Sequence, residues 1–266
     1  MPKYIFIQSI LFFHSIFILG QNRRQPDITF DTDYFDAVDH WVVLPEKATD
    51  STYLLGYVYL DEVMGFTLAF ENKVTIDAEN HWIIHPNAKT FIIRTTLNNT
   101  TPMVYRLPKS QIETFKLPEK PLWLKLYDHE KSPEELVLMG YQYSTVGKSD
   151  LAIPLLEKAY ASNPETRNLA FELSFAYNAT AQYYKAISIL NEGIANERKN
   201  YMLYRELGYA MLKTNRTQDA EKVYEQGIQV CENEIQRREM AIDMAQTFYR
   251  LKDVEKFEKW AAILKQ

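Results

Sequence analysis

The sequence predicts an α+β protein of two parts, an N-terminal antiparallel β-rich domain followed by a C-terminal all-α solenoid of paired helices. Between residues 21 and 127, short runs of β-branched and aromatic residues alternate with turn-forming residues, a pattern typical of antiparallel strands. From residue 133 to residue 266, apolar residues recur at helical spacing, and no connection exceeds a few residues. The chain of 266 residues is long enough for two modest domains.

The first 20 residues have the features of a secretory signal peptide. Lys3 precedes a mainly apolar run from Tyr4 to Leu19, and Gly20 places a small residue before the polar stretch that follows. The run is short for a membrane span, which needs roughly 20 apolar residues. We therefore expect export with cleavage after Gly20. An uncleaved peptide that anchors the protein in the membrane and a buried helix are the alternatives.

The β-rich part is expected to contain seven short strands, bounded by turn residues such as those at 71–72. Their spacing predicts an antiparallel sheet, in the form of a small sandwich or a half-barrel. A short helix over 108–115 and a proline-rich elbow at 118–121 are expected before a polar junction at 127–132. The expected strands are residues 40–44, 53–60, 65–70, 73–77, 81–85, 90–94 and 103–107.

The helical part begins with a clear start signal. Ser132 can cap the first helix, Pro133 suits its first turn, and the carboxylates of Glu134 and Glu135 face the positive end of the helix dipole. We expect a helix from Pro133 onward.

Small and large residues in this half repeat every 34 residues. Small residues are expected where the two helices of one unit cross, and large residues where they fill the space between neighbouring units. The small positions are Gly140, Ser174, Gly208, Ala152, Ala186 and Ala220, and the large ones are Tyr143, Tyr177, Met211, Leu156, Leu190 and Tyr224.

This period resembles the tetratricopeptide repeat, a helix-turn-helix unit of 34 residues. The resemblance covers roughly half of the chain and implies units at about 133–166, 167–200 and 201–234, with a degenerate unit at 238–266. It also implies that the first helices of successive units line a concave groove that binds another protein or a peptide segment. The groove residues implied in this sequence are Tyr141, Phe171, Phe175, Asn178, Arg205, Tyr209, Lys213, Tyr249 and Arg250.

Aromatic residues and arginine contribute strongly to binding at protein interfaces, and arginine with lysine can hold a carboxylate. The chaperone-binding version of such a groove uses a denser set of Lys, Arg and Asn than this one. Asn178 and Lys213 reproduce that set only in part.

Other functional classes find little support in the sequence. A net charge of −5 argues against nucleic-acid binding, which requires an excess of Lys and Arg. His81 and His85 share one face of a strand, but no further ligand at metal-binding spacing accompanies them. No catalytic or nucleotide-binding motif occurs. We therefore expect no catalytic residue, no metal and no cofactor.

The favoured function is a non-enzymatic scaffold or adaptor that holds a partner polypeptide in the groove. The signal sequence combined with such repeats resembles envelope proteins of Gram-negative bacteria, particularly Bacteroidota, which implies a periplasmic or cell-envelope location. Two alternatives stay open. The β-rich domain could bind glycan or cell wall through Trp41, Trp82 and Tyr59, with the helices as a recruiting arm. It could also be an enzyme whose site no local motif reveals.

Overall fold

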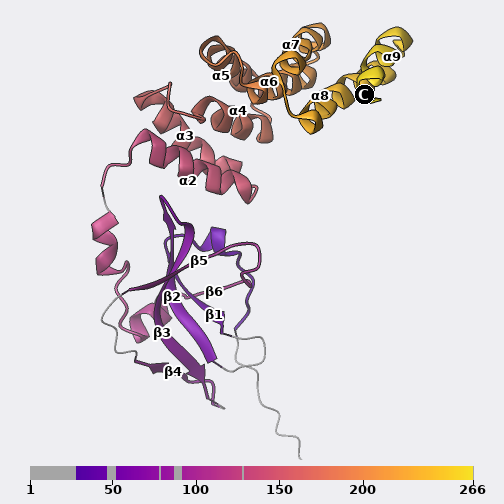
Figure 1. Cartoon of the computed structure of the whole chain (residues 1–266). Coiled ribbons are helices and arrows are strands. Elements are labelled where there is room, and N and C mark those ends of the chain that lie inside the picture. The colour runs from indigo at the N-terminus through magenta and orange to yellow at the C-terminus, as the bar shows by residue number, and fades with distance from the viewer. Residues whose placement is uncertain (1–27, 47–51, 78, 87–91, 128, 266) are drawn as a thin grey trace, which may run out of the picture.

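The computed structural model describes residues 28–46, 52–77, 79–86, 92–127 and 129–265. It confirms the predicted two-part α+β fold, with an antiparallel sheet followed by paired helices (Figure 1). The predicted signal peptide at residues 1–20 lies outside the described residues. No helix within the described ranges has both the length and the apolar character needed to cross a membrane.

The β-rich part is a single antiparallel sheet in which neighbouring strands follow the order β4-β3-β2-β1-β6, with β5 also paired to β3. The predicted sandwich, which would require two packed sheets, is therefore wrong for the described residues. A one-turn helix, η1 (Tyr34–Ala37), precedes the sheet. The strands are β1 (His40–Pro45), β2 (Thr52–Asp61), β3 (Gly65–Ile76), β4 (Trp82–His85), β5 (Ile93–Thr96) and β6 (Tyr105–Arg106).

Strand β3 runs through the position where the sequence predicted a turn between two strands. Leu55 pairs with Asn72, but the next residue, Gly56, pairs with Phe70, so that Glu71 is an extra residue in β3. An antiparallel ladder accommodates one extra residue as a β-bulge, which bends the strand without ending it. The polar pair at 71–72 therefore marks a bulge and not a turn.

Both faces of the sheet are covered. One face packs against η1, with Tyr34 and Phe66 in its apolar cluster. The other packs against the segment that contains α1 (Lys109–Thr114) and η2 (Leu122–Tyr127), where Trp123 joins the cluster. Helix α1 confirms the short helix predicted over 108–115.

The helical part consists of four successive hairpins, each with a first and a second helix. The capping box predicted at its start is present, since Ser132 and Glu135 bond reciprocally to each other's backbone amides. The first helix of the fourth hairpin starts at Glu234, four residues before the expected start of that unit at residue 238. The side chain of Asn233 caps this helix by accepting a hydrogen bond from the backbone amide of Gln236. The pairs are α2 (Pro133–Thr145) with α3 (Ser149–Ser162), α4 (Leu169–Ala179) with α5 (Tyr183–Asn196), α6 (Tyr201–Lys213) with α7 (Thr217–Val230), and α8 (Glu234–Leu251) with α9 (Val254–Ile263).

Small residues lie where the two helices of a unit cross. A Cβ atom added to Gly140 would lie 2.6 Å from Cγ of Leu156, and one added to Gly208 would overlap the ring of Tyr224. Leu156 and Tyr224 belong to the second helix of the same unit, so part of their role is to fill the crossing within a unit. Ala220 is fully buried, as the repeat pattern predicts.

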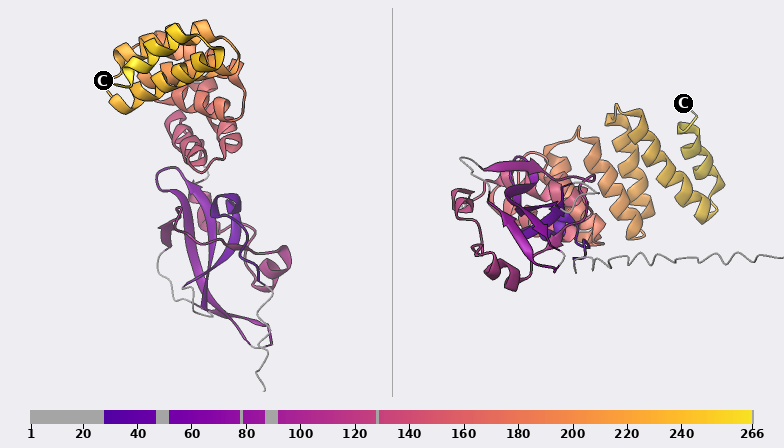
Figure 2. Two further views of the ribbon diagram at one scale, coloured as in Figure 1. Left: turned by 90° about the vertical axis from the view of Figure 1, so that its right-hand side faces the viewer. Right: turned by 90° about the horizontal axis from the view of Figure 1, so that it is seen from below.

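The β-rich part occupies the place of a unit before the first hairpin. Tyr177 of the second unit reaches back to Glu157 of the first, to which its hydroxyl donates at 2.6 Å. Tyr143, its equivalent one repeat earlier, instead packs edge-on against Phe66 of β3, with ring centroids 5.4 Å apart. Lys148 adds an ion pair of 2.7 Å with Asp36 at the same junction. The sheet therefore covers the N-terminal end of the solenoid (Figure 2).

We expect Gly208→Ala and Ala220→Leu each to lower the free energy of unfolding by about 1–3 kcal/mol, because each overpacks a closed helix crossing. Alanine is a better helix former than glycine, so a loss at position 208 isolates the steric effect. Chemical denaturation measures both values. Ala262→Leu is the control, since residue 262 is exposed on α9. Equal stabilities of the wild type and both core variants would contradict the repeat alignment.

Candidate functional site

The first helices of units one to three form the inner side of the solenoid. Helix α2 contacts α4, and α4 contacts α6, whereas the second helices in the described part of the chain make no comparable contacts with one another. Helices that approach more closely lie on the inside of a curved stack. The surface of the first helices that carries the nine predicted residues is called the inner groove below.

The predicted aromatic residues of units one to three lie along the inner groove with part of their rings accessible. Phe171 and Phe175 are one helical turn apart on α4, with ring centroids 6.2 Å apart. Tyr141 is 46% exposed on α2. On α6, Tyr209 packs against Tyr183, and the ammonium of Lys213 lies 5.1 Å from the centre of the Tyr209 ring. This part of the groove combines apolar rings with few polar contacts of their own.

The predicted Asn178 and Arg205 are engaged in a buried network. The amide Nδ2 of Asn178 donates to the Glu206 carboxylate at 2.9 Å, and Arg205 pairs with the other oxygen of that carboxylate at 2.9 Å. Arg205 also bonds to Gln236 and lies 3.6 Å from a carboxylate oxygen of Glu239 on α8. These bonds tie α4, α6 and α8 together. A ligand carboxylate at Arg205 would have to compete with two carboxylates of the protein.

The remaining two predicted residues, Tyr249 and Arg250, lie at the C-terminal hairpin. Tyr249 is 72% exposed and packs against Phe257 of α9. Both residues line a shallow pocket of ≈ 620 Å³, together with Ile242 and Leu264. They lie two units away from the Phe171–Phe175 pair and form a separate region of the groove.

One set of inner residues escaped the sequence analysis, a row of carboxyl groups with one member in each of units two to four. Glu172 and Glu206 are 34 residues apart, and Asp243 follows 37 residues after Glu206, because the last unit matches the repeat three residues late. These three residues are called the carboxyl row. The repeat could have revealed this row, because an acidic residue occupies the corresponding position in each of the three units when their sequences are aligned.

The members of the carboxyl row differ in their partners. Glu206 is held by Asn178 and Arg205, and Asp243 accepts a hydrogen bond of 3.0 Å from the hydroxyl of Tyr224. Glu172 is only 9% exposed, and its carboxyl has no hydrogen bond or ion pair to any described residue. Burial raises the pKa of Glu172 from 4.5 to about 7. Burial also raises the pKa of Asp243.

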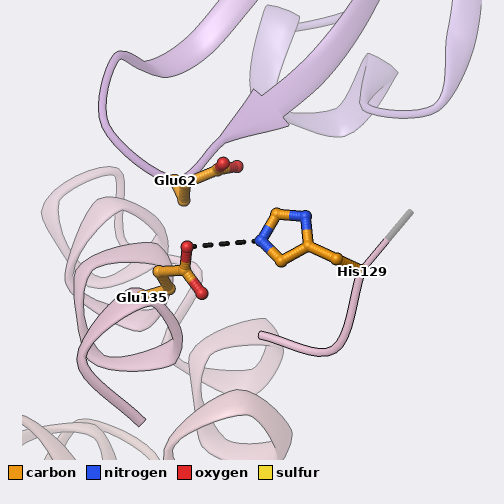
Figure 3. Close-up of side chains that lie close together, drawn as sticks. All are labelled: Glu62, His129 and Glu135. Atoms are coloured by element: carbon orange, nitrogen blue, oxygen red, sulfur yellow. Dashed lines mark hydrogen bonds and ion pairs between the residues drawn. The ribbon is translucent and has the colours of Figure 1, made fainter. Parts of the chain in front are cut away.

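Two clusters of described residues have the donor atoms that a metal ion would need. Glu62, His129 and Glu135 meet at the junction of the two parts, where His129 lies 3.4 Å from Glu135 (Figure 3). Lys131 already pairs with Glu62 at 3.2 Å, and the backbone amide of Ser132 donates to Glu135, which lowers the pKa of that carboxyl. A cation would have to displace these partners, so the cluster acts as a polar joint.

The second cluster, Asp77, Glu79 and His81, lies in the turn before β4. Asp77 accepts hydrogen bonds from the backbone amides of Glu79 and His81, which fix the turn. This arrangement is a turn motif that needs no ion. His85 lies apart from it and bonds to Thr75.

The aromatic residues considered for glycan stacking do not form an open platform. Trp41 and Tyr59 are buried, and the indole nitrogen of Trp41 donates to the carbonyl of Pro118. Trp82 is half-buried between Tyr105 and Phe115. A sugar ring needs an accessible aromatic face, and these side chains use their faces to build the core of the β-rich part.

Comparisons with known proteins find tetratricopeptide-repeat relatives over part of the chain. The chain is 26% identical over 107 residues to tetratricopeptide repeat protein 21A of Mus musculus, covering 40% of this chain and 8% of the relative. It is 24% identical over 168 residues to the Homo sapiens protein of that name, covering 60% of this chain and 12% of the relative. The chain thus spans a small fraction of the length of these relatives. No family model matches.

Solved structures of MamA are also similar to part of the chain. MamA MSR-1 is 19% identical with a TM-score of 0.44, over 59% of this chain and 91% of that one. MamA from Desulfovibrio magneticus RS-1 is 16% identical with a TM-score of 0.44, over 54% of this chain and 80% of that one.

We expect Glu172→Gln to stabilise the protein by about 3 kcal/mol at pH 8. The pKa of Glu172 is raised on folding, so wild-type stability falls as the pH rises from 4.5 through about 7, and the neutral amide avoids this loss. The gain should shrink toward zero at pH 4.5. Chemical denaturation of both proteins at several pH values measures the difference between their free energies of unfolding. The titration of other groups, such as Asp243, affects both proteins equally and cancels in that difference. A gain independent of pH would contradict the assignment.

Proposed function

We propose that this tetratricopeptide-repeat protein is a non-enzymatic scaffold or adaptor that holds a segment of another protein in its inner groove. Its four hairpins and its curated relatives carry the family assignment. In this proposal, several repeat units together build the surface that binds the partner.

The observation that carries the proposal is the row of partly accessible aromatic rings on the inner side of the stack. Tyr141, Phe171, Phe175 and Tyr209 come from three successive first helices. Aromatic side chains offer large contact areas at a low cost in conformational entropy, and they dominate many interfaces. Because they lie on rigid, packed helices, the groove is already formed before a partner arrives, which lowers the entropy cost of binding.

We also propose that the protein works outside the cytoplasm, in the periplasm or cell envelope of a Gram-negative bacterium. The apolar run at residues 4–19 and its small-residue boundary at Gly20 support this. The single cysteine, Cys231, is consistent with a protein that folds without an internal disulfide in an oxidising compartment.

Site-specific photo-crosslinking in the native cell tests the groove. We expect a benzophenone amino acid at Tyr209 to capture a discrete protein partner, because that side chain lies on the inner side. The same group at Tyr184, which is 75% exposed on the second helix α5, is the matched control and should capture far less. Equal capture at both positions, or capture at Tyr184 alone, would exclude the inner groove as the binding surface.

Intact-mass measurement of the protein purified from its native cell tests the proposed export. The expected mass is that of a chain starting at Gln21, recovered from the envelope or periplasmic fraction. A full-length mass in the cytoplasmic fraction would overturn the proposed location and leave the binding role of the groove open to its own test.

A further inference from the structure

The carboxyl row distinguishes one position of the inner groove from its equivalents. Glu206 and Asp243 each have a hydrogen-bond donor supplied by the protein, from Asn178 in one case and Tyr224 in the other. Glu172 occupies the same place in its unit, is buried to the same degree as Glu206, and has no donor among the described residues. Its oxygens are not among the fully enclosed polar atoms, so they keep a narrow opening to solvent.

The repeat shows what is missing at Glu172. Asn178, on the preceding first helix, supplies the donor for Glu206. One repeat before Asn178 stands Ser144, so Ser144 relates to Glu172 as Asn178 relates to Glu206. A serine hydroxyl is shorter than an asparagine amide and does not bond to the carboxyl. The Ser144 oxygen is itself enclosed without a hydrogen-bond partner in the described chain. Two unsatisfied polar side chains thus belong to the seam between α2 and α4.

An unpaired buried carboxyl destabilises a fold, because it loses water and gains no replacement donor. Such a group is well suited to receive a donor from a ligand. The surroundings favour a cation over a neutral donor. Phe175 lies one helical turn after Glu172 on α4 and packs against Phe171, so a partly accessible aromatic pair on the same stretch of helix is available to an ammonium or guanidinium group.

The distribution of charged residues along the groove also favours a cationic group at unit two. The predicted groove residues of units one and two include no cation, whereas Arg205, Lys213 and Arg250 all belong to units three and four. Arg205 is already neutralised by Glu206 and Glu239. A positively charged side chain placed at unit two would therefore meet a carboxyl group and aromatic rings and no neighbouring cation of the groove.

We infer that the partner segment carries a lysine or arginine whose side chain enters the inner groove at unit two and pairs with the Glu172 carboxyl, beside the partly accessible ring pair of Phe171 and Phe175. This inference rests on the proposed function and specifies the chemistry of the partner. Binding would then supply to Glu172 the donor that Asn178 supplies to Glu206.

A selection from a random dodecapeptide display library against the purified protein tests the inference. We expect the enriched peptides to share a lysine or arginine. By fluorescence anisotropy, Glu172→Gln should bind such a peptide at least about tenfold more weakly than the wild type, as expected when one partner of a buried charge pair is removed. The weaker binding should accompany the higher stability of this variant, so unfolding cannot explain it.

Two controls define the contribution of the pair. Glu258→Gln removes the same charge at an exposed position of α9 and should bind like the wild type. Norleucine in place of the peptide's lysine or arginine should weaken binding to the wild type but have little further effect on Glu172→Gln, as in a double-mutant cycle for a direct contact.

Other outcomes separate the two proposals. Enriched peptides without a shared cation, or cationic peptides that Glu172→Gln binds as tightly as the wild type, would overturn the inference and leave the groove as a protein-binding surface. If no peptide is enriched and the benzophenone at position 209 captures no partner, the proposed function and the inference both fail.

Discussion

The helical half of this protein depends on the close approach of two helix backbones within each unit. That approach is possible only where side chains are very small, and Gly140, Ser174 and Gly208 meet this requirement one repeat apart. Once the crossing is set, Leu156 and Tyr224 pack over the glycines of their own units, and the stack of hairpins follows. The inner groove, and any binding by it, therefore depends on the absence of a few atoms at each crossing.

The sequence was sufficient to predict the helical units and the approximate places of most strands, because both depend on local patterns of residue type. It did not predict how the strands assemble. Glu71 and Asn72 look like a turn locally, and only the long pairing of β2 with β3 makes them a bulge. The role of Tyr143 could not be predicted either, because its contact with Phe66 joins residues far apart in the chain and outside the repeat.

In the candidate site, too, the repeat pattern predicted some features, whereas contacts between units could not be predicted. The aromatic residues of the groove were predicted because the repeat assigns them to an inner face. Arg205 and Asn178 were predicted from the repeat, but the carboxylate that engages both of them was not, since a glutamate on a helix usually indicates a solvated surface. Glu172 is buried without a partner among the described residues, and the position that corresponds to Asn178 one repeat earlier is Ser144. Such facts become visible only when the units are compared in space.

The sheet has a consequence for how the groove could change during evolution. Because the β-rich part stands where a preceding hairpin would stack, with Phe66 taking the contact that a second helix would otherwise make, duplication of a unit at that end would separate the two parts. Units can be gained or lost at the opposite end with the junction intact. A lineage that lengthens its groove would therefore extend it in one direction only, and the Glu172 position would keep a constant distance from the sheet.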